Sequence, residues 1–393
     1  MKNILYLTEN LDFYADSGAK IKTINTLHCL NKNFKVKVLS LNSEKKLNNN
    51  YQKNLKNIDF TYLADPRIEI PIKKRLLETL TNYLLGKPYY FFQYKNLKFK
   101  NLVNDTIKSL KPDCIHIDHL TMAQYLPQTK NEKWVYEEHN IEYKLRFEMA
   151  KFSKKIGYHW LIWLIESILL FFQERKIIKK FDYVFTISKS DQRALTKITK
   201  KNNVYLQNIF MPIKNNKKKT QATKQTLLFV GDLEWLPNRQ GISWFIKEIF
   251  PKLDNVKLNV VGQIDSAFKQ QHENSKISFW GYQKEISNFF NHADIFIAPL
   301  KIGEGVRLKI LDAFSRKIPV ISSKNAIKGL TVKHKQELLI ARDNSEFISL
   351  IKKVLDKKIE TNTILENALS YLKENHSNDE NKKFIKRYQK ILG

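Results

Sequence analysis

A short stretch near position 305 combines two glycines, two carboxylates and two cations. Its residues are Gly303, Glu304, Gly305, Arg307, Lys309 and Asp312. Carboxylates accept hydrogen bonds from hydroxyl groups, whereas Arg and Lys side chains bind phosphates. Two carboxylates that flank two cations therefore suit a ligand with hydroxyl groups at both ends and phosphates in the middle. A nucleotide sugar has that layout.

The sequence around this stretch predicts the elements that would position it. An apolar strand is expected over 294–299, a helix over 306–316 and a second strand over 319–322. Backbone amides at a helix N-terminus bind anions, and ligands of parallel sheets lie beyond the carboxyl ends of the strands. Gly303 and Gly305 would let the backbone approach a sugar diphosphate closely.

This stretch resembles the signature of the retaining glycosyltransferases of family 4, also called group 1 glycosyltransferases. The signature is an acidic residue, seven residues and a second acidic residue, which here gives Glu304 and Asp312. The resemblance covers nearly the whole chain and is looser before residue 110. Further segments that match lie at 230–238, 279–282, 293–300, 327–330, 137–143 and 181–188.

The resemblance implies an α/β protein of the GT-B fold. Such proteins have two Rossmann-like domains that face each other across a cleft, and a C-terminal helix that crosses back to the first domain. Alternating strand and helix patterns independently favour parallel sheets. We expect an acceptor-binding domain at 1–213 with a returning helix at 378–393, and a donor-binding domain at 225–377. The basic stretch 214–224 is the predicted linker.

The resemblance also assigns roles in the second domain. It implies that Glu304 is catalytic and meets the sugar hydroxyls, and that Asp312 holds the ribose. Many relatives supply an Arg and a Lys after the first strand of this domain, where this chain has Asp232 and Pro237. We expect Arg307 and Lys309 to take over the diphosphate.

Other residues complete the predicted donor and acceptor sites. Arg239 is a weaker candidate for the diphosphate, and Gly231 and Tyr282 follow predicted strands where relatives bind the donor. Tyr282 would stack on the base, offer only its backbone, or merely pack a turn. In the first domain, Ser17, Gly18 and Lys20 form a candidate acceptor or phosphate loop at a helix start.

Two polar positions follow buried strands of the first domain. Asp118, with His119 beside it, and His139 each follow a strand end, where ligands of parallel sheets bind. Asp118 falls near a catalytic position that is often His in relatives, so we predict catalytic roles for Asp118 and His139. The leaving phosphate itself can accept the acceptor's proton, and no general base is assigned. No metal motif of the Asp-x-Asp type occurs, so we expect neither metal nor cofactor besides the nucleotide sugar.

Composition restricts the partners and the compartment. The formal net charge is +29, and the only cysteines are Cys29 and Cys114. Unclustered cysteines favour a reducing, cytoplasmic location. The positive charge reflects either a general enrichment in lysine, as compositional drift produces, or a function at an anionic membrane surface. A nucleic-acid partner is not expected, because the sequence has no basic motif with interspersed aromatic residues.

One apolar, aromatic segment, 158–172, is flanked by basic residues. It is shorter than the roughly 20 residues that a membrane-spanning helix needs. It is either an internal amphipathic helix or a helix in the membrane interface on the cytoplasmic face.

The sequence thus predicts a metal-independent hexosyl- or N-acetylhexosaminyltransferase that acts on a glycan, lipid-linked or protein acceptor. Two alternatives stay open: a nucleotide-sugar 2-epimerase of the same fold, and a non-catalytic partner subunit. Release of free sugar without an acceptor would identify the epimerase.

Overall fold

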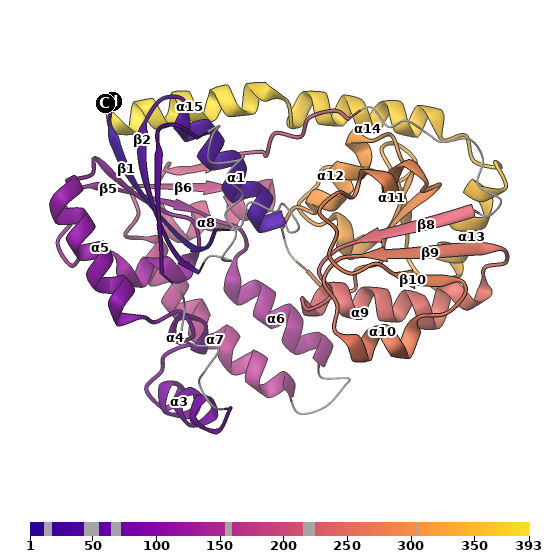
Figure 1. Ribbon diagram of the computed structural model, residues 1–393, viewed down its shortest axis with the longest axis horizontal. Helices are drawn as coiled ribbons and strands as arrows, with labels where there is room; N and C mark the ends of the chain where they lie inside the picture. The colour runs from indigo at the N-terminus through magenta and orange to yellow at the C-terminus, as the bar shows by residue number, and fades with distance from the viewer. Residues whose placement is uncertain (12–17, 43–54, 64–71, 154–158, 215–224, 304) are drawn as a thin grey trace. The chain divides into compact units, whose positions relative to one another are not determined.

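The computed structural model describes residues 1–393 except 12–17, 43–54, 64–71, 154–158, 215–224 and 304 (Figure 1). The chain forms two compact units. The first consists mainly of residues 1–208 together with 381–393, and the second mainly of residues 209–380. The C-terminal residues therefore belong to the first unit, as the GT-B prediction requires.

The first unit is built on a seven-stranded sheet whose described pairings are all parallel. Its order is β3-β2-β1-β4-β5-β6-β7. The strands are β1 (Asn3–Asn10), β2 (Lys35–Asn42), β3 (Ile58–Tyr62), β4 (Cys114–Ile117), β5 (Lys133–Glu137), β6 (Tyr183–Thr186) and β7 (Val204–Leu206).

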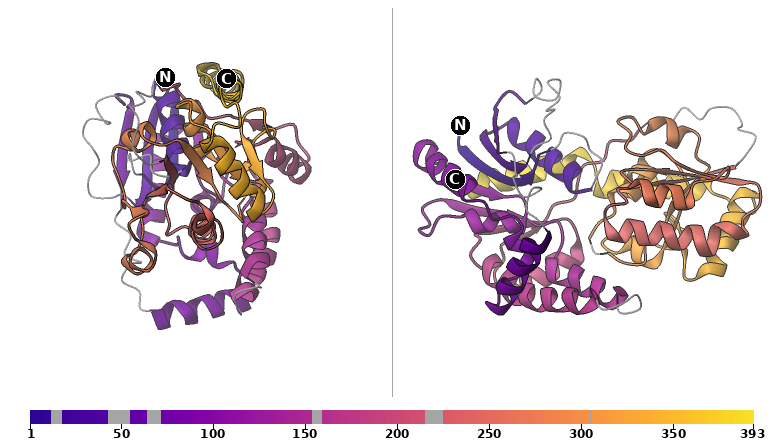
Figure 2. Two further views of the ribbon diagram at one scale, coloured as in Figure 1. Left: turned by 90° about the vertical axis from the view of Figure 1, so that its right-hand side faces the viewer. Right: turned by 60° about the horizontal axis from the view of Figure 1, so that its bottom comes forward.

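Helices cover both faces of this sheet (Figure 1, Figure 2). One face packs against α1 (Gly18–Asn31) and α15 (Asn378–Leu392). The other is covered by α4 (Tyr89–Phe92), α5 (Leu97–Leu110), the 3-10 helix η2 (Leu120–Tyr125), α7 (His159–Ile178) and α8 (Lys189–Thr199). Two more helices lie outside this layer: α3 (Ile72–Leu84) packs against α4, and α6 (Glu142–Ser153) packs against α7. Capping residues set several of these ends; Asn96, for example, accepts a hydrogen bond from the Phe99 amide at the start of α5.

The C-terminal helix α15 completes the core of the first unit. Its apolar residues recur at helical spacing, and Phe384, Tyr388 and Ile391 are buried against the sheet. The Tyr388 hydroxyl hydrogen-bonds His116 of β4, and the ring stacks on Phe185 of β6. Both aromatic and polar contacts therefore fix the helix to the first unit.

The second unit has a six-stranded parallel sheet of order β10-β9-β8-β11-β12-β13. Its strands are β8 (Gln225–Val230), β9 (Val256–Val261), β10 (Ile277–Phe279), β11 (Ile295–Ala298), β12 (Val320–Ser323) and β13 (Leu339–Ala341). Its helices are α9 (Leu236–Trp244), continued by short turns to Lys252, then α10 (Ser266–His272), α11 (Ser287–Asn291), α12 (Leu308–Ser315), α13 (Asn344–Leu355) and α14 (Asn362–Asn375).

Each sheet contains a point where the strand order reverses direction, because the chain winds outward to both sides. In the first sheet this switch point lies between β1 and β4, and in the second between β8 and β11. The crevice beyond the carboxyl ends of the strands at such a point is where doubly wound sheets bind ligands.

Most of the expected elements are confirmed, and several need correction. Helix α12 begins at Leu308, because Gly305 has a positive φ of 77° and Arg307 is still extended, so the predicted start at Val306 was wrong. Strand β3 and helices α3, α4, α6, α8, α10, α11 and α14 were not predicted. The predicted linker falls almost wholly outside the described residues. No helix in the described part of the chain is long and apolar enough to span a membrane.

Candidate functional site

The loop after β11 brings the two-glycine stretch to the switch point of the second sheet. Gly303 has φ 138° and Gly305 has φ 77°, a backbone conformation that side-chain-bearing residues rarely adopt. A Cβ atom on Gly303 would also collide with the Arg307 guanidinium. The φ angle therefore favours glycine at this position, and a Cβ atom here would push the Arg307 guanidinium out of its observed place. Glu304, the predicted catalytic acid of this loop, lies outside the described residues.

Arg307 and Lys309 lie at the beginning of α12, beside this loop. Arg307 is buried, with its guanidinium 5.5 Å from the ring centre of Trp235. The Lys309 Nζ donates a hydrogen bond of 2.8 Å to Asn238 Oδ1 and lies 4.5 Å from the Phe229 ring centre. The structure thus places both predicted phosphate ligands at the carboxyl edge of the second sheet.

Lys309 is held in an unusual electrostatic state. Burial, and secondly the charge of Arg307, lowers the pKa of Lys309 to about 7, while Asp232 opposes the shift. A Cβ atom on Gly231 would lie only 2.5 Å from the Lys309 Nζ, so the glycine after β8 leaves the space that this ammonium occupies. Two adjacent cations in such a place favour an anionic ligand, because an anion would relieve their mutual repulsion.

Asp312 is buried in α12 and is already engaged. Its Oδ1 accepts hydrogen bonds from Lys214 Nζ at 2.7 Å and Arg316 Nε at 3.1 Å. Two cations thus hold the predicted ribose ligand in place through Oδ1, and its Oδ2 accepts no hydrogen bond from the residues that the structure describes. Lys214 stands at the edge of the predicted linker, and its role was not foreseen from the sequence.

Three glycines line the carboxyl ends of β8, β9 and β10. The Gly231 amide donates to the Val261 carbonyl and the Gly262 amide donates to the Gly281 carbonyl, both at 2.9 Å. A Cβ atom on Gly262 would collide with the Gly231 carbonyl. This row leaves open backbone beside Lys309, and Tyr282, which follows it, is 40% exposed.

Arg239 does not join the cation pair. Its guanidinium forms an ion pair with Asp265 and lies 4.7 Å from the Phe268 ring centre. Conversely, the sequence reasoning gave no role to Asn238, whose amide oxygen holds Lys309 and whose amide nitrogen donates to the Asp232 carbonyl at 2.7 Å. The hydrogen bond between Asn238 and Lys309 joins residues that are 71 positions apart, and the local sequence around neither residue predicts it.

A second polar cluster lies at the switch point of the first sheet. Asp118 follows β4, is fully buried, and accepts hydrogen bonds from Thr8 of β1 and Thr23 of α1, each at 2.7 Å. His139 Nε2 lies 3.0 Å from Asp118 Oδ1, and His119 Nδ1 lies 3.3 Å from Oδ2. The structure therefore brings together the three polar residues that the sequence placed at neighbouring strand ends.

The two imidazoles of this cluster stack with ring centres 4.2 Å apart and have opposite protonation tendencies. Burial, aided by the charges of His119 and Lys22, lowers the pKa of His139 to about 4. Although burial opposes it, the charges of Glu9 and Asp118 raise the pKa of His119 to about 9. Burial also opposes ionisation of Asp118, but the two histidines hold its pKa well below the usual range. At neutral pH the cluster is thus an aspartate, an imidazolium and a neutral imidazole.

Two buried glutamates beside this cluster have pKa values that are shifted in opposite directions: the pKa of Glu137 is lowered and that of Glu138 is raised. Glu137 is buried and hydrogen-bonds Thr26 and His116, and Lys22 lies 3.7 Å from it. Glu138 is also buried, and its carboxyl oxygens have no hydrogen-bond partner among the described residues. Burial, and secondly the charge of Asp191, raises the pKa of Glu138 well above the usual range, which favours the neutral form of this carboxyl. Lys22 donates instead to the Glu138 carbonyl oxygen.

Asp118, His119 and His139 also form a set that could hold a metal ion, with ligand atoms within 4.8 Å of one another. Asp118, however, already serves two hydroxyls and two imidazoles, so its oxygens would have to exchange partners to bind a metal. Of the predicted phosphate loop, Ser17 lies outside the described residues. Gly18 and Lys20 lie in the first turn of α1.

Comparison with known proteins agrees with this geometry. Residues 224–357 match the model of a protein family described as glycosyl transferases group 1. A protein of Klebsiella pneumoniae, described as an uncharacterized 44.6 kDa protein in the cps region, is 25% identical over 259 residues. That match covers 62% of this chain and 64% of the relative, so the chain matches less than two thirds of the relative's length.

Solved structures share the architecture of the whole chain. Sucrose-phosphate synthase from Thermosynechococcus elongatus has a TM-score of 0.75 at 16% identity and covers 100% of this chain and 99% of its own. Anabaena HepE, solved in complex with UDP and glucose, has a TM-score of 0.68 at 13% identity, with 99% and 100% coverage. At such identities these structures establish the fold, which is GT-B.

Proposed function

Because residues 224–357 are a group 1 glycosyltransferase domain within a GT-B fold, we propose that this protein is a retaining glycosyltransferase. It transfers a hexosyl or N-acetylhexosaminyl group from a nucleotide-diphosphate sugar to an acceptor. One observation carries the proposal: Arg307 and Lys309 lie together beside the two-glycine loop at the switch point of the second sheet.

The cation pair would act on the leaving group. As the glycosidic bond breaks, the departing nucleotide diphosphate gains negative charge, and fixed positive charge beside it lowers the barrier. Removing one such group from an active site typically costs about 3 kcal/mol of transition-state stabilisation. The Lys309 ammonium is positioned in advance by Asn238, so little reorganisation is needed when charge develops.

The rest of the donor assignments follow from the same placement. Gly231, Gly303 and Gly305 would admit the diphosphate and sugar, Tyr282 would meet the base, and Asp312 would hold the ribose through the oxygen that its cations leave. Glu304 is proposed to bind the sugar hydroxyls and to be catalytic. Glu304→Gln should abolish most transfer while leaving nucleotide binding intact; unchanged transfer would remove Glu304 from the mechanism.

Transfer is proposed to be independent of metal, since two side-chain cations can neutralise the diphosphate. Activity that persists in excess EDTA would agree with this, whereas strict dependence on added Mg²⁺ or Mn²⁺ would contradict it. Asp118 and His139 are proposed to be catalytic in the acceptor-binding unit, and Ser17, Gly18 and Lys20 are proposed to form its acceptor or phosphate loop. In a retaining reaction the leaving phosphate can itself take the acceptor's proton, so no protein base is required here.

The acceptor is proposed to be a lipid-linked or surface-glycan precursor at a membrane. The relative from a cps region supports a role in surface polysaccharides. Helix α7 supports the membrane: Leu161, Ile165, Ile168 and Phe172 recur at helical spacing and are 39–67% exposed. An exposed apolar helix face on a chain of net charge +29 suits the interface of an anionic membrane on its cytoplasmic side.

The function is tested by a thermal-shift screen of nucleotide sugars, followed by transfer assays with the best ligand. A ligand at 100 times its dissociation constant stabilises the folded state by about 2.7 kcal/mol. Arg307→Gln and Lys309→Gln should remove the shift, while Arg239→Gln, which loses an ion pair elsewhere, should keep it. Free sugar released without acceptor would instead identify the epimerase, and binding without either reaction would identify the non-catalytic subunit.

A further inference from the structure

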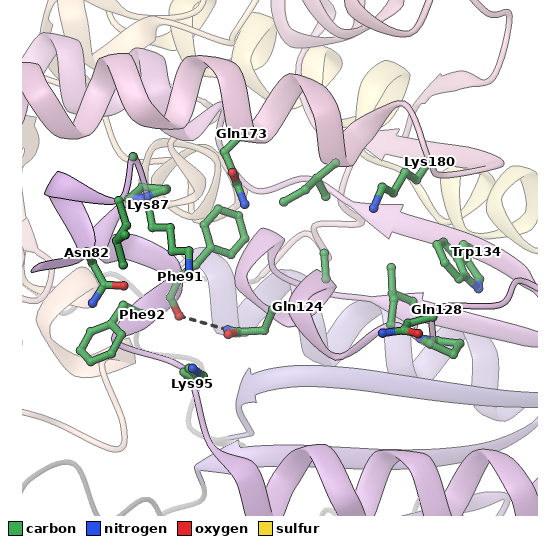
Figure 3. A pocket seen from close by; sticks show the side chains of 17 residues that line it. Asn82, Lys87, Phe91, Phe92, Lys95, Gln124, Gln128, Trp134, Gln173 and Lys180 are labelled. Carbon is green, nitrogen blue, oxygen red and sulfur yellow. Dashed lines mark hydrogen bonds between the residues drawn. The ribbon is translucent and has the colours of Figure 1, made fainter. Parts of the chain in front are cut away.

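A cavity of about 830 Å³ lies within the first unit, apart from the residues assigned above (Figure 3). It is bounded by the end of α3, the turn into α4, helix η2 and the last turns of α7. None of Asp118, His119 or His139 lines it. Its volume is in the range of sites for small organic ligands.

The lining combines apolar and aromatic surface with amide groups. Phe91 and Phe92 of α4, Leu126, and Ile177 of α7 supply the apolar part. Figure 3 shows Gln173 descending from α7 toward the middle of the cavity, where Gln124 donates a hydrogen bond of 3.1 Å to the Phe91 carbonyl. A ligand here would therefore meet both hydrocarbon surface and hydrogen-bonding groups.

The charge of the lining has one sign. Lys87, Lys95 and Lys180 line the cavity, and none of the lining residues that the structure describes is Asp or Glu. Among the residues that the structure describes, none of these three ammonium groups has a carboxylate partner within salt-bridge distance. Three lysines without a countercharge favour an anionic ligand.

One buried donor in the lining has no described acceptor. Trp134 lines the cavity with only 5% of its surface exposed. Its indole Nε1 is buried and has no hydrogen-bond acceptor among the described residues. Buried N–H groups are nearly always paired, so an acceptor supplied by a ligand or solvent is expected beside this one.

The rim of the cavity leads onto exposed apolar surface. Leu85 lines the cavity and is 68% exposed, and Leu84 beside it is 87% exposed. Phe172, next to Gln173 on α7, is 67% exposed. Helices α4 and α7 are joined nearby, since the Glu166 carboxylate of α7 accepts hydrogen bonds from the Tyr89 and Tyr90 amides of α4.

We propose that this cavity binds an anionic membrane lipid. The lipid's phosphate would be held among the three lysines, and its chain would lie along Phe91, Phe92 and Ile177 and leave over the exposed leucines. A free phosphate would use the lysines alone and leave the apolar lining bare. The statement that this lipid is the anchor of the acceptor rests on the proposed function, whereas the binding itself does not.

The test uses the full chain and three probes: dihexanoyl phosphatidylglycerol, dihexanoyl phosphatidylcholine and inorganic phosphate, each titrated as a monomer by calorimetry. Phosphatidylglycerol should bind about tenfold or more tightly than either other probe. Phosphatidylcholine lacks the net negative charge that the lysines would bind, and inorganic phosphate lacks the acyl chains that the apolar lining would contact. Equal binding of phosphatidylcholine, or of inorganic phosphate, would overturn the proposal, as would a failure of phosphatidylglycerol to bind.

Matched variants locate the site. Lys87→Gln, Lys95→Gln and Lys180→Gln combined should weaken phosphatidylglycerol binding about tenfold or more. The control combines Lys98→Gln, Lys100→Gln and Lys108→Gln, which remove the same charge from exposed positions of α5 in the same unit. Equal losses in both variants would show non-specific attraction and overturn the proposal.

A second variant keeps the charge and fills the space. Gln173→Trp should also abolish phosphatidylglycerol binding, and circular dichroism should confirm that it folds; retained binding would contradict the cavity as the site. All variants are screened with the nucleotide sugars in parallel. Lipid binding without any nucleotide-sugar binding would refute the proposed function and leave this site standing, and the reverse result would refute only the site.

Discussion

His139 Nε2 lies 3.0 Å from Asp118 Oδ1, and the stacked His119 contacts the other oxygen of the same carboxylate. Asp118→Asn removes the one charge that both imidazoles face. We expect the unfolding free energy to fall by about 3 kcal/mol, the usual cost of breaking a buried charged network. The pKa of His119, about 9 in the native protein, should also fall. Denaturant unfolding and NMR titration of the imidazoles measure the two effects; an unmoved His119 pKa would refute the electrostatic account.

The same histidines predict how stability depends on pH. The pKa of His119 is about 9 when folded and about 6.5 in an unfolded chain, so its contribution is complete below pH 6.5 and is lost as pH rises toward 9. The pKa of His139 is about 4, so its contribution is complete above pH 6.5 and is lost as pH falls toward 4. We expect the unfolding free energy, measured from pH 4 to 9, to depend less on pH above 6.5 in His119→Gln. In His139→Gln it should depend less on pH below 6.5. His292→Gln in the other unit is the control and should leave both pH dependences in place.

Lys309 predicts a pH-dependent affinity for the nucleotide diphosphate. Its pKa is about 7 in the free protein, and a bound diphosphate would raise it. Affinity should therefore be constant below pH 7 and weaken as pH rises above 7, by up to about tenfold per unit. Calorimetry between pH 6 and 9 checks this, with the nucleoside as a control ligand that should show no such dependence. Lys309→Arg should flatten the profile; a profile equally steep in that variant would assign the titration to another group.

Gly303 offers a test of the loop geometry with an internal control. Gly303→Ala introduces a Cβ atom at φ 138° that collides with the Arg307 guanidinium. Gly86→Ala introduces one at φ 67° with nothing within 4 Å. Both variants should be destabilised by about 1 kcal/mol or more through backbone strain. Only Gly303→Ala should lose nucleotide binding in the thermal-shift assay. Equal nucleotide binding by the two variants would show that Arg307 does not contribute to the donor site.

The apolar face of α7 predicts reversible binding to anionic vesicles. Each cation near such a surface contributes about 1 kcal/mol, and the attraction is screened over about 8 Å at physiological ionic strength, so binding should weaken with salt. Ile165→Gln with Ile168→Gln should weaken co-sedimentation about tenfold or more, because each side chain loses on the order of 1.5 kcal/mol of burial. Leu97→Gln, at a 72% exposed position of α5, is the matched control. If the protein does not bind anionic vesicles at low salt, its net positive charge reflects amino-acid composition alone, and the acceptor is expected to be soluble.

The fold could be predicted because the apolar runs of buried strands can be recognised in the sequence without knowing which strands pair with them. The expected strands 294–299 and 319–322 are found as β11 (Ile295–Ala298) and β12 (Val320–Ser323), because each contains adjacent apolar residues and all its residues are buried, as in a parallel sheet that is covered on both faces. Helix α3 was not predicted, although its apolar and polar residues lie on separate faces. The contact between Asn238 and Lys309 could not be foreseen, since nothing in either local sequence marks a pairing made only when β8 and β11 become neighbours. The roles of Glu304, Asp312 and Tyr282 remain predictions.

The docking of α15 onto the first sheet has a consequence for synthesis on the ribosome. Tyr388 and Phe384 fill the core beneath Val36 and Phe185, yet they leave the ribosome after every residue of the second unit. At roughly 5–20 residues per second, the first sheet must wait on the order of ten seconds for its last helix. During that interval the second unit can fold alone, while the earlier unit holds an uncovered apolar face. Translation order and folding order are therefore reversed, and a chaperone that shields this face would act before the chain is released.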